Sequence, residues 1–442
     1  MKPRRATDRP SLVSRAVRID SPPFRAVVEA LDRPRTVWGA PEEATVVAGG
    51  AAATVAADGP DRLDAVREAA NGLFSSGDVH AGTEAACPRL FGGLAFHEDG
   101  SDDGPWEPFP EARFVFPRVQ VTYTEDRGTW LTVNAVDPDA TPASVEDRLA
   151  AERDRLTGLD DRPPAAPPGI VDRRRTTDRE DWRGSVAAAV DRIRDDDLRK
   201  VVLAQALAAD LADDPAVGDV LARLRDTYPD CHLFLVEPDE TASFLGATPE
   251  RLVTRRGRTV ETGALAGTTG RGETPAEDEW LARELRNSEK NVHEHELVTE
   301  AIRDQLRPFA ASVSTGQRTV RRLATVQHLW TPITAELAAD EHVLDLVAAL
   351  HPTPAVGGLP PDAALRTIRE TEAFDRGWYA APVGWFDAAG NGSFAVALRS
   401  AVVEPERATM FAGVGIVADS DPDAEWDEVE LKFRPMLDEL ER

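Results

Sequence analysis

The chain has 442 residues, more than one hydrophobic core usually serves, so we expect two domains or one large domain with an elaborated sheet. Its 78 Asp and Glu against 51 Lys and Arg give a formal net charge of −27, spread over the whole length. A field of this sign repels nucleic acid and anionic membranes, and we expect neither as a partner.

The positive charges are almost all arginine, because the only lysines are Lys2, Lys200, Lys290 and Lys432. Few lysines, abundant Asp and Ala, and dispersed acidity are typical of a protein from a salt-rich cytoplasm. There, hydrated carboxylates keep the protein soluble and salt screens their mutual repulsion. We therefore expect a halophilic protein that loses structure in dilute buffer.

Several mechanisms and locations are not expected. The basic residues near the start precede no apolar core, and nowhere do about 18 apolar residues run together, so we expect a soluble, cytoplasmic protein. Cys87 and Cys231 are too few and too far apart for a disulfide framework or a zinc cluster. His293 and His295 lack the spacing that would place two ligands on one helix face.

The first part of the chain, residues 1–158, is expected to be an N-terminal α+β region. Residues 89–100 and 112–126 have the character of strands with turn punctuation, and residues 141–156 have that of an amphipathic helix. Residues 159–172, "LDDRPPAAPPGIVD", follow as a proline-rich linker, in which helix and central strand are both disfavoured.

In residues 173–442, long helices alternate with strands. Helices are predicted over 181–197 and 277–306, and strands over 200–209, 241–247, 392–404 and 408–418. No strand precedes a glycine-rich dinucleotide fingerprint. This mixture predicts an α+β fold and not a doubly wound sheet.

Lys200 opens a strand that is apolar on both faces, "KVVLAQAL". A lysine at a strand end commonly reaches back to water, and this stretch alone favours that interpretation. The alternative is a desolvated lysine that acts as a base, a role that arginine cannot fill because guanidinium is effectively never deprotonated. The survival of Lys200 in a chain that avoids lysine favours function.

Glu250 follows a Thr-Pro step between two predicted strands, in "GATPERLV". A glutamate there is usually a solvated turn residue. A carboxyl held against strands could also remain protonated and act as a general acid, which complements a lysine base.

Residues 267–272 form a predicted glycine- and threonine-rich loop, which is either an ordinary connection or an anion cradle that includes Thr268.

Within the predicted long helix 277–306, Glu294 is expected to pair with Lys290 one turn earlier. In the last helix, capped by Asp421, Glu428 and Lys432 share a face opposite the apolar stripe. Glutamates from separate helices are of the kind that Mg²⁺ takes as ligands.

Arg399 belongs to the strand predicted over 392–404 and projects from a face lined with alanines. It could bind a carboxylate bidentately, although an edge salt bridge is an equal alternative. Gly413 and Gly415, on the next strand, let a ligand approach the backbone or mark a bulge.

Nine ordered segments between about Arg199 and Lys432 together resemble the chorismate-utilising enzymes, and within them the isochorismate synthase branch. They are "KVVLAQAL", "LGATPERLV", "ETGALAGTTGRG", "NSEKNVHEHELV", "QHLWTPITAEL", "LHPTPAVGGLP", "YAAPVGWF", "FAVALRSA" and "FAGVGIVADSDPDAEWDEVELK". The resemblance implies the anthranilate synthase component I type of α+β fold, with antiparallel sheets packed together and helices outside, and a chorismate-binding catalytic region over 173–442.

The resemblance also implies an activity and a role for each matched residue. The activity is that of a Mg²⁺-dependent isomerase, which converts chorismate to isochorismate by water addition and loss of the ring hydroxyl. Lys200 matches the base that activates water, and Glu250 the acid that protonates the departing hydroxyl. Glu294 and Glu428 match the metal ligands. The positions matched to substrate binding are Thr268, His328, Arg399, Gly413, Gly415 and Lys432.

Related activities are the alternatives. Salicylate synthases share the lysine base and then eliminate pyruvate, which makes them the nearest second candidate. Ammonia-using anthranilate synthases typically carry glutamine at the position of Lys200, and aminodeoxychorismate synthases carry a lysine at the position of Ala266. No glutaminase subunit is therefore expected. A catalytically silent subunit would not need Lys200, Glu250, Glu294 and Glu428. Menaquinone and siderophore pathways both remain open.

Overall fold

The computed structural model describes residues 12–41, 43–75, 77–98 and 104–442. Lys2 and the first residues of the predicted N-terminal region lie outside these ranges. None of the helices in the described ranges combines the length and the apolar composition that a membrane crossing requires. Cys87 and Cys231 are both free thiols.

The described strands form one connected sheet that branches at β6 (Ala112–Thr124). One edge of β6 pairs with β3 (Thr45–Ala57), and the other pairs with β7 (Gly128–Val136) and β5 (Arg89–Leu94). Among the described strands, only β1 (Leu12–Ile19) and β4 (Gly77–His80) pair in parallel. The sheet is therefore almost wholly antiparallel.

Two arms extend from the branch. The first arm continues from β3 through β2 (Arg35–Gly39), β10 (His232–Glu237), β11 (Ser243–Thr248), β20 (Ser400–Glu404), β21 (Arg407–Ile416) and β9 (Lys200–Leu211). The second arm continues from β5 through β18 (Pro382–Asp387), β19 (Gly392–Val396), β12 (Arg251–Arg256), β13 (Thr259–Gly270) and β16 (Val326–Leu337). Short strands complete the edges: β8 (Ile170–Arg175) and β17 (Gly358–Leu359) on β9, and β14 (Ala310–Thr315) and β15 (Thr319–Arg322) on β16.

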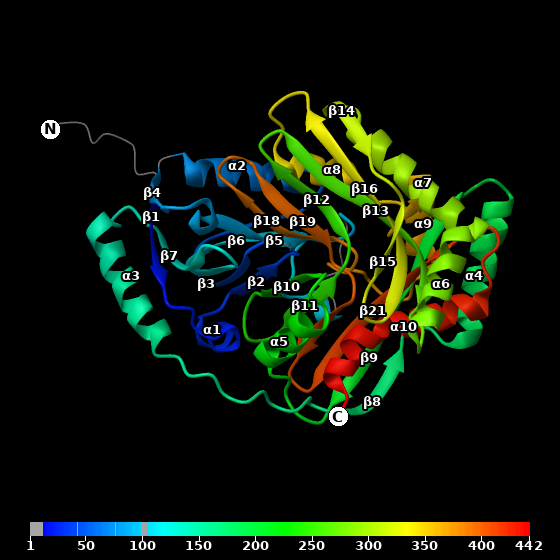
Figure 1. The fold of residues 1–442 in the computed structure, drawn as a ribbon, viewed down its shortest axis with the longest axis horizontal. Helices are drawn as coiled ribbons and strands as arrows, with labels where there is room; N and C mark the ends of the chain where they lie inside the picture. The colour runs from blue at the N-terminus through cyan, green and yellow to red at the C-terminus, as the bar shows by residue number, and fades with distance from the viewer. Residues whose placement is uncertain (1–11, 42, 76, 99–103) are drawn as a thin grey trace.

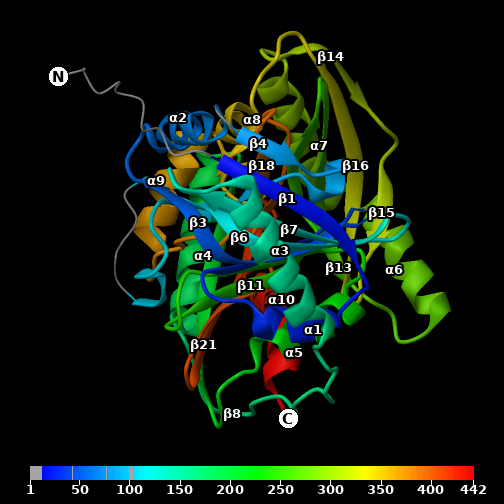
Figure 2. The same ribbon diagram turned by 90° about the vertical axis from the view of Figure 1, so that its left-hand side faces the viewer.

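Helices lie outside the strands (Figure 1). α3 (Pro142–Thr157) covers β1 and β7, as Figure 2 shows, and α10 (Pro422–Leu440) packs on β21 beside α4 (Arg179–Arg194). α7 (Glu289–Leu306) lies against β13 and β16. The other helices are α1 (Phe24–Ala30), α2 (Arg62–Phe74), α5 (Val217–Thr227), α6 (Pro275–Asn287), α8 (Val343–Leu350) and α9 (Pro361–Thr371).

Strands from the two predicted regions pair with each other. β2 of the N-terminal region pairs with β10, and β5 pairs with β18. Between the regions, residues 159–169 contain neither helix nor strand, and β8 begins at Ile170, inside the predicted linker. The strands after the linker are thus continuous with a sheet that the N-terminal region begins.

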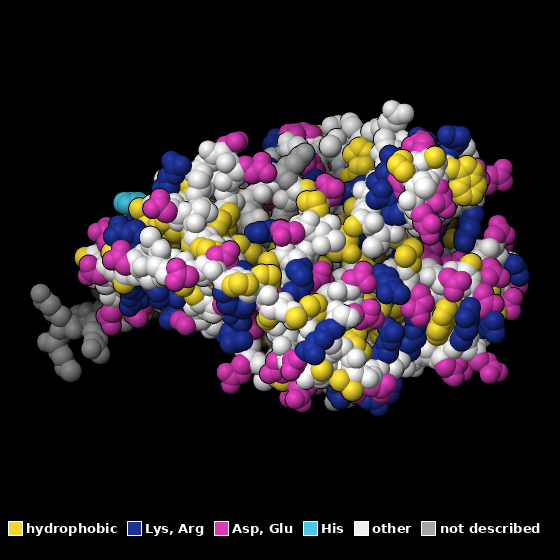
Figure 3. All heavy atoms as spheres, turned by 60° about the horizontal axis from the view of Figure 1, so that its bottom comes forward, with side chains coloured by type: hydrophobic (Ala, Val, Ile, Leu, Met, Phe, Trp, Pro, Cys, Tyr) yellow, Lys and Arg dark blue, Asp and Glu magenta, His cyan; other side chains and the backbone are white. Residues whose placement is uncertain are grey.

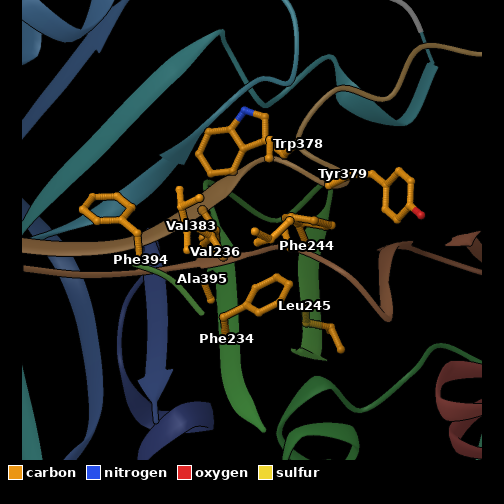
Figure 4. Packing of buried hydrophobic residues seen from close by; sticks show 14 of the residues in the cluster. Phe234, Val236, Phe244, Leu245, Trp378, Tyr379, Val383, Phe394 and Ala395 are labelled. Atoms are coloured by element: carbon orange, nitrogen blue, oxygen red, sulfur yellow. The ribbon is translucent and has the colours of Figure 1, made fainter. Parts of the chain in front are cut away.

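A single large hydrophobic core joins the two arms. Figure 4 shows Phe234 and Phe244 of the first arm gathered with Val383 and Phe394 of the second. On the outside, Figure 3 shows Asp and Glu interspersed with Lys and Arg over the visible face. The core therefore supplies a rigid support on which the arms face each other.

Three local predictions were wrong. The helix predicted over 277–306 is two helices, because Ser288 adopts an extended conformation and caps α7 by accepting a hydrogen bond from the Asn291 amide. The predicted loop at 267–270 belongs to β13, which absorbs Gly267 as a bulge at φ +77°. The strand predicted over 392–404 breaks before Ser400, where Arg399 has φ +49°.

Candidate active site

The chain crosses between the two arms at two places, and a predicted site residue lies at each. Glu250 lies between β11 of the first arm and β12 of the second, and Arg399 lies between β19 of the second and β20 of the first. The crossings are joined, since the Val396 amide donates to the Glu250 carbonyl oxygen at 2.9 Å. The left-handed conformation of Arg399 is costly for a residue with a side chain and is common at functional sites.

One pocket between these elements is lined by all ten residues that the sequence singled out. The residues come from β9, β13, β16, β21, α7, α10 and the two crossings, so no short segment of sequence contains the site. The ten are Lys200, Glu250, Thr268, Glu294, His328, Arg399, Gly413, Gly415, Glu428 and Lys432.

Each lysine of the described chain faces a glutamate in this pocket. Lys200 Nζ lies 3.0 Å from Glu294 Oε1, and Lys432 Nζ lies 2.8 Å from Glu428 Oε1. Lys200 is 1% exposed, so it does not extend to solvent as the ordinary strand-end interpretation requires. Glu294 pairs with this lysine and not with Lys290, which corrects the expected pairing one helical turn apart.

Glu250 is buried at the crossing, and burial raises its pKa to about 7, although Lys200, Lys432 and Arg399 act in the opposite direction. Desolvation disfavours the charged carboxylate more strongly than these three cations favour it. A carboxyl with this pKa is substantially protonated near neutral pH. It can therefore donate a proton to a leaving group.

His328 is held by two partners that fix its tautomer. Arg399 Nη2 donates to His328 Nε2 at 2.7 Å, and because arginine only donates, the imidazole carries its proton on Nδ1. Nδ1 then donates to Thr268 Oγ1 at 3.1 Å. Burial, with Arg399 and Lys432 nearby, lowers the pKa of His328 well below its usual value. His328 is thus a neutral group that orients Arg399.

Arg399 has a guanidinium nitrogen without a partner. Nη1 is buried and makes no hydrogen bond in the described structure. A buried donor left unpaired is costly, and burial lowers the pKa of Arg399. The Arg399 side chain lines the pocket, and a guanidinium is suited to binding an anionic ligand such as a carboxylate.

Gly413 and Gly415 lie on β21 opposite Ala204 and Val202 of β9. The Gly413 carbonyl oxygen accepts a hydrogen bond from Lys432 Nζ at 2.9 Å. A Cβ atom at Gly415 would lie 2.7 Å from Glu294 Oε1 and 2.8 Å from Lys200 Cε. Glycine at this position leaves the room that the Lys200–Glu294 pair occupies.

Glu294 and Glu428 fit a Mg²⁺ site in their chemistry. Both carboxylates line the pocket from separate helices, α7 and α10. In the ranges that the structure describes, no three His, Cys, Asp or Glu side chains are arranged to enclose a metal. Mg²⁺ usually takes one or two protein carboxylates and fills its other positions with water and substrate oxygens, so two glutamates are a suitable donor set.

The sequence analysis missed several lining residues. Lys290 pairs with Glu425 at 3.0 Å, and Glu425 is 2% exposed and lies one turn before Glu428. The scarcity of lysine that singled out Lys200 applies equally to Lys290 and could have found it. Tyr379 and Arg376 also line the pocket, and no spacing in the sequence pointed to them.

Comparison with known proteins agrees with this site. The model of the chorismate binding enzyme family matches residues 2–441. A salicylate biosynthesis isochorismate synthase of Pseudomonas aeruginosa PAO1 is 39% identical over 441 residues, covering 98% of this chain and 91% of the relative.

Solved structures share the architecture. The menaquinone-specific isochorismate synthase MenF from Escherichia coli has a TM-score of 0.83 at 25% identity, covering 98% of this chain and 95% of that one. Anthranilate synthase component I from Streptococcus pneumoniae shares the fold, with a TM-score of 0.74 at 23% identity over 90% of this chain and 93% of that one. These likenesses confirm the predicted anthranilate synthase component I type of α+β fold. The chain belongs to the chorismate binding enzyme family.

Proposed function

We propose that this protein is an isochorismate synthase, an isomerase that converts chorismate to isochorismate with Mg²⁺. The observation that carries the proposal is the presence of both Lys200 and Glu250 in the lining of one pocket. Lys200 is fully buried beside Glu294, and Glu250 is buried with a pKa of about 7. An amine base and a protonated carboxyl are the two groups that adding water and expelling a hydroxyl require.

The charge of the pocket supports a dianionic substrate. Five cationic side chains line it, and one of them, Arg376, is neutralised by Glu372 outside the lining. The other four face four carboxyls, of which Glu250 is substantially protonated near neutral pH. This is a local exception in a chain whose formal net charge is −27. Chorismate carries two carboxylates, and the Arg399 guanidinium in the pocket lining offers one of them hydrogen-bond donors. The five cationic residues are Lys200, Lys290, Arg376, Arg399 and Lys432.

In the proposed reaction, Lys200 removes a proton from water as the oxygen attacks the ring carbon beside the carboxylate-bearing carbon. Glu294, 3.0 Å away, stabilises the ammonium that forms. The conjugated double bonds shift, and Glu250 protonates the hydroxyl that leaves from the far end of the diene. One water enters and one leaves, so the net change is an isomerisation without any redox step.

Glu294 and Glu428 would hold Mg²⁺, which when bound supplies Lewis-acid polarisation of the substrate carboxylate. Two of the similar proteins reported above are named for salicylate biosynthesis and for menaquinone, and both are named isochorismate synthases. We therefore propose the formation of isochorismate as the reaction. The dispersed net charge of −27 supports a cytoplasm rich in salt as the location.

The test is product analysis by chromatography after incubation with chorismate and Mg²⁺ in molar potassium chloride, with and without ammonium. A parallel reaction in ¹⁸O-water reports the origin of the new hydroxyl. Isochorismate that carries one ¹⁸O and forms equally well without ammonium supports the proposal. Unlabelled isochorismate contradicts attack by water. Salicylate would assign the protein to the pyruvate-eliminating enzymes, and an amino product would contradict Lys200 as a base.

A further inference from the structure

The strand that carries Lys200 is paired unevenly along its two edges. One edge of β9 pairs with β21 continuously from Val201 to Asp210. The other edge pairs with β17 at Lys200 and Val201, and with β8 from Leu207 onwards. Between these two short strands, residues 202–206 have no neighbouring strand on that edge.

Two side chains fill part of this gap with hydrogen bonds of the kind a strand would make. Arg376 Nη2 donates to the Val202 carbonyl oxygen at 2.9 Å, and the Ala204 amide donates to Glu372 Oε1 at 2.8 Å. The two side chains are also bonded to each other, Arg376 Nε to Glu372 Oε2 at 2.8 Å. An ion pair thus replaces a strand at the point where β9 enters the pocket.

The same pair reaches the chain segment that lies beside β9 in the pocket lining. Arg376 Nη1 donates to the Val356 carbonyl oxygen at 2.8 Å, and Val356 lines the pocket. The Gly357 carbonyl oxygen in turn accepts from the Val202 amide at 2.9 Å. The pair therefore adds side-chain hydrogen bonds to the backbone contact between β9 and the segment that carries Val356, and helps to fix how that segment lies beside the strand of Lys200.

The side chains of Arg376 and Glu372 are 1% and 3% exposed. Desolvating two charges costs about as much as their attraction returns, so a buried ion pair is weak evidence of stabilisation. Apolar side chains could fill the same volume, but they could not form hydrogen bonds with the Val202 carbonyl oxygen and the Ala204 amide of β9. The specific property of the pair is the geometry that it imposes.

We propose that the Arg376–Glu372 pair is a positioning device for the reaction, which holds Lys200 at the correct distance from the substrate. This inference rests on the proposed function, because it assumes that Lys200 acts on water beside chorismate. The pair does not contact the reacting atoms. It acts through the backbone of β9 and through the segment that carries Val356.

The kinetic test compares Arg376→Lys and Glu372→Gln with the wild type. We expect kcat to fall roughly 10- to 100-fold, because a misplacement of about 1 Å costs this much, while KM changes less than about threefold. KM is spared because Arg399, His328 and Lys432 lie on other elements. The control is Glu370→Gln, which removes the exposed pair that Glu370 forms with Arg192 at 3.2 Å, and it should leave both constants unchanged.

The double variant Arg376→Met, Glu372→Met separates positioning from stability. An apolar replacement of the whole pair leaves the Val202 carbonyl oxygen and the Ala204 amide without these partners, so its melting temperature should fall, and kcat should stay low even at temperatures where the variant is fully folded. A double variant with wild-type kcat would overturn the proposal, as would unchanged kcat in both single variants.

A third measurement does not depend on chorismate. Amide hydrogen exchange in peptides covering residues 200–206 should be faster in both single variants and unchanged in the control. Unchanged exchange in both variants would overturn the proposal whatever reaction the protein catalyses. If the wild type forms no isochorismate while exchange accelerates in the two single variants, the proposed function is wrong, but the pair still stabilises the backbone of β9.

Discussion

Lys200 Nζ lies 3.0 Å from Glu294 Oε1, an ion pair that joins the first residue of β9 to α7 inside the pocket. The lysine is 1% exposed, and the side chain of Glu294 is 12% exposed. Glu294 is also a predicted metal ligand. One carboxylate would therefore serve both the base and the metal, which couples the two halves of the proposed mechanism.

Replacing Lys200 by alanine should abolish turnover without unfolding the protein. General base catalysis contributes about 10²–10⁴ to a rate, so we expect kcat to fall by at least about 10². Steady-state kinetics measure the loss of turnover, and a melting curve shows whether the variant remains folded. The control is Arg192→Ala at an exposed pair, which should change neither. Near-normal turnover in the folded Lys200→Ala variant would mean that another group activates water.

The raised pKa of Glu250 leads us to expect that the activity depends on pH. Its folded pKa of about 7 lies above the ordinary value of 4.5, so the protonated acid is present below pH 7 and is lost as the pH rises through 7. We expect kcat/KM to fall on an alkaline limb near pH 7, tenfold per pH unit. Two buried histidines, His328 in the pocket and His295 on α7, do not account for such a limb, because the pKa of His295 is lowered to about 4 and that of His328 is also lowered.

The same shift affects stability, with a sign that can be checked separately. A raised folded pKa contributes stability that is fully present below pH 4.5 and is lost as the pH rises through 7. The melting temperature of the wild type should therefore fall between pH 5 and 8 relative to that of Glu250→Gln, which has no titrating group there. Parallel pH profiles for the two proteins would contradict burial as the cause of the shift.

The regular elements were predictable from sequence where the pattern is local. The helix predicted over 181–197 is α4, and the strand predicted over 200–209 is β9. Asp421 caps α10 as expected, because its carboxylate accepts hydrogen bonds from two amides of the first turn. Such features depend on neighbouring residues, which a sequence displays directly.

The crossings between the arms were not predictable in the same way. "GSFAVALRSAVVE" alternates like one strand, but β19 pairs with β12 while β20 pairs with β11, so the chain must leave one arm before Ser400. The choice of partner is a long-range property that alternation cannot reveal. Nine of the ten site residues were candidates from their local sequence and His328 only through the family resemblance, which also supplied their roles. Their convergence in one pocket depends on these crossings.

Gly415→Ala should impair turnover through the Lys200–Glu294 pair. The new Cβ would lie 2.7 Å from Glu294 Oε1 and 2.8 Å from Lys200 Cε. Both contacts are with flexible side chains, so these can move aside and the fold should survive. We expect kcat to fall about 10- to 100-fold, since small misplacements of catalytic groups cost this much.

The matched control for this variant is Gly184→Ala on α4, where a Cβ meets nothing within 4 Å. That change should leave kcat unaltered and stabilise the helix by about 0.5–1 kcal/mol. A Gly415→Ala enzyme with wild-type kcat would show that the pair tolerates displacement, and would weaken the case for a tightly placed Lys200.

The net charge of −27 leads to the last prediction, which concerns salt. Interspersed arginines neutralise only part of the acidic surface, so the folded chain repels itself at low ionic strength (Figure 3). The Debye length falls from about 10 Å at 0.1 M salt to about 3 Å at 1 M, so molar potassium chloride screens this repulsion. We expect the melting temperature to rise between dilute buffer and molar salt. Potassium chloride and sodium chloride should act alike, because screening depends on ionic strength and not on the cation. A melting temperature that is flat over this range would show that the excess carboxylates do not limit stability.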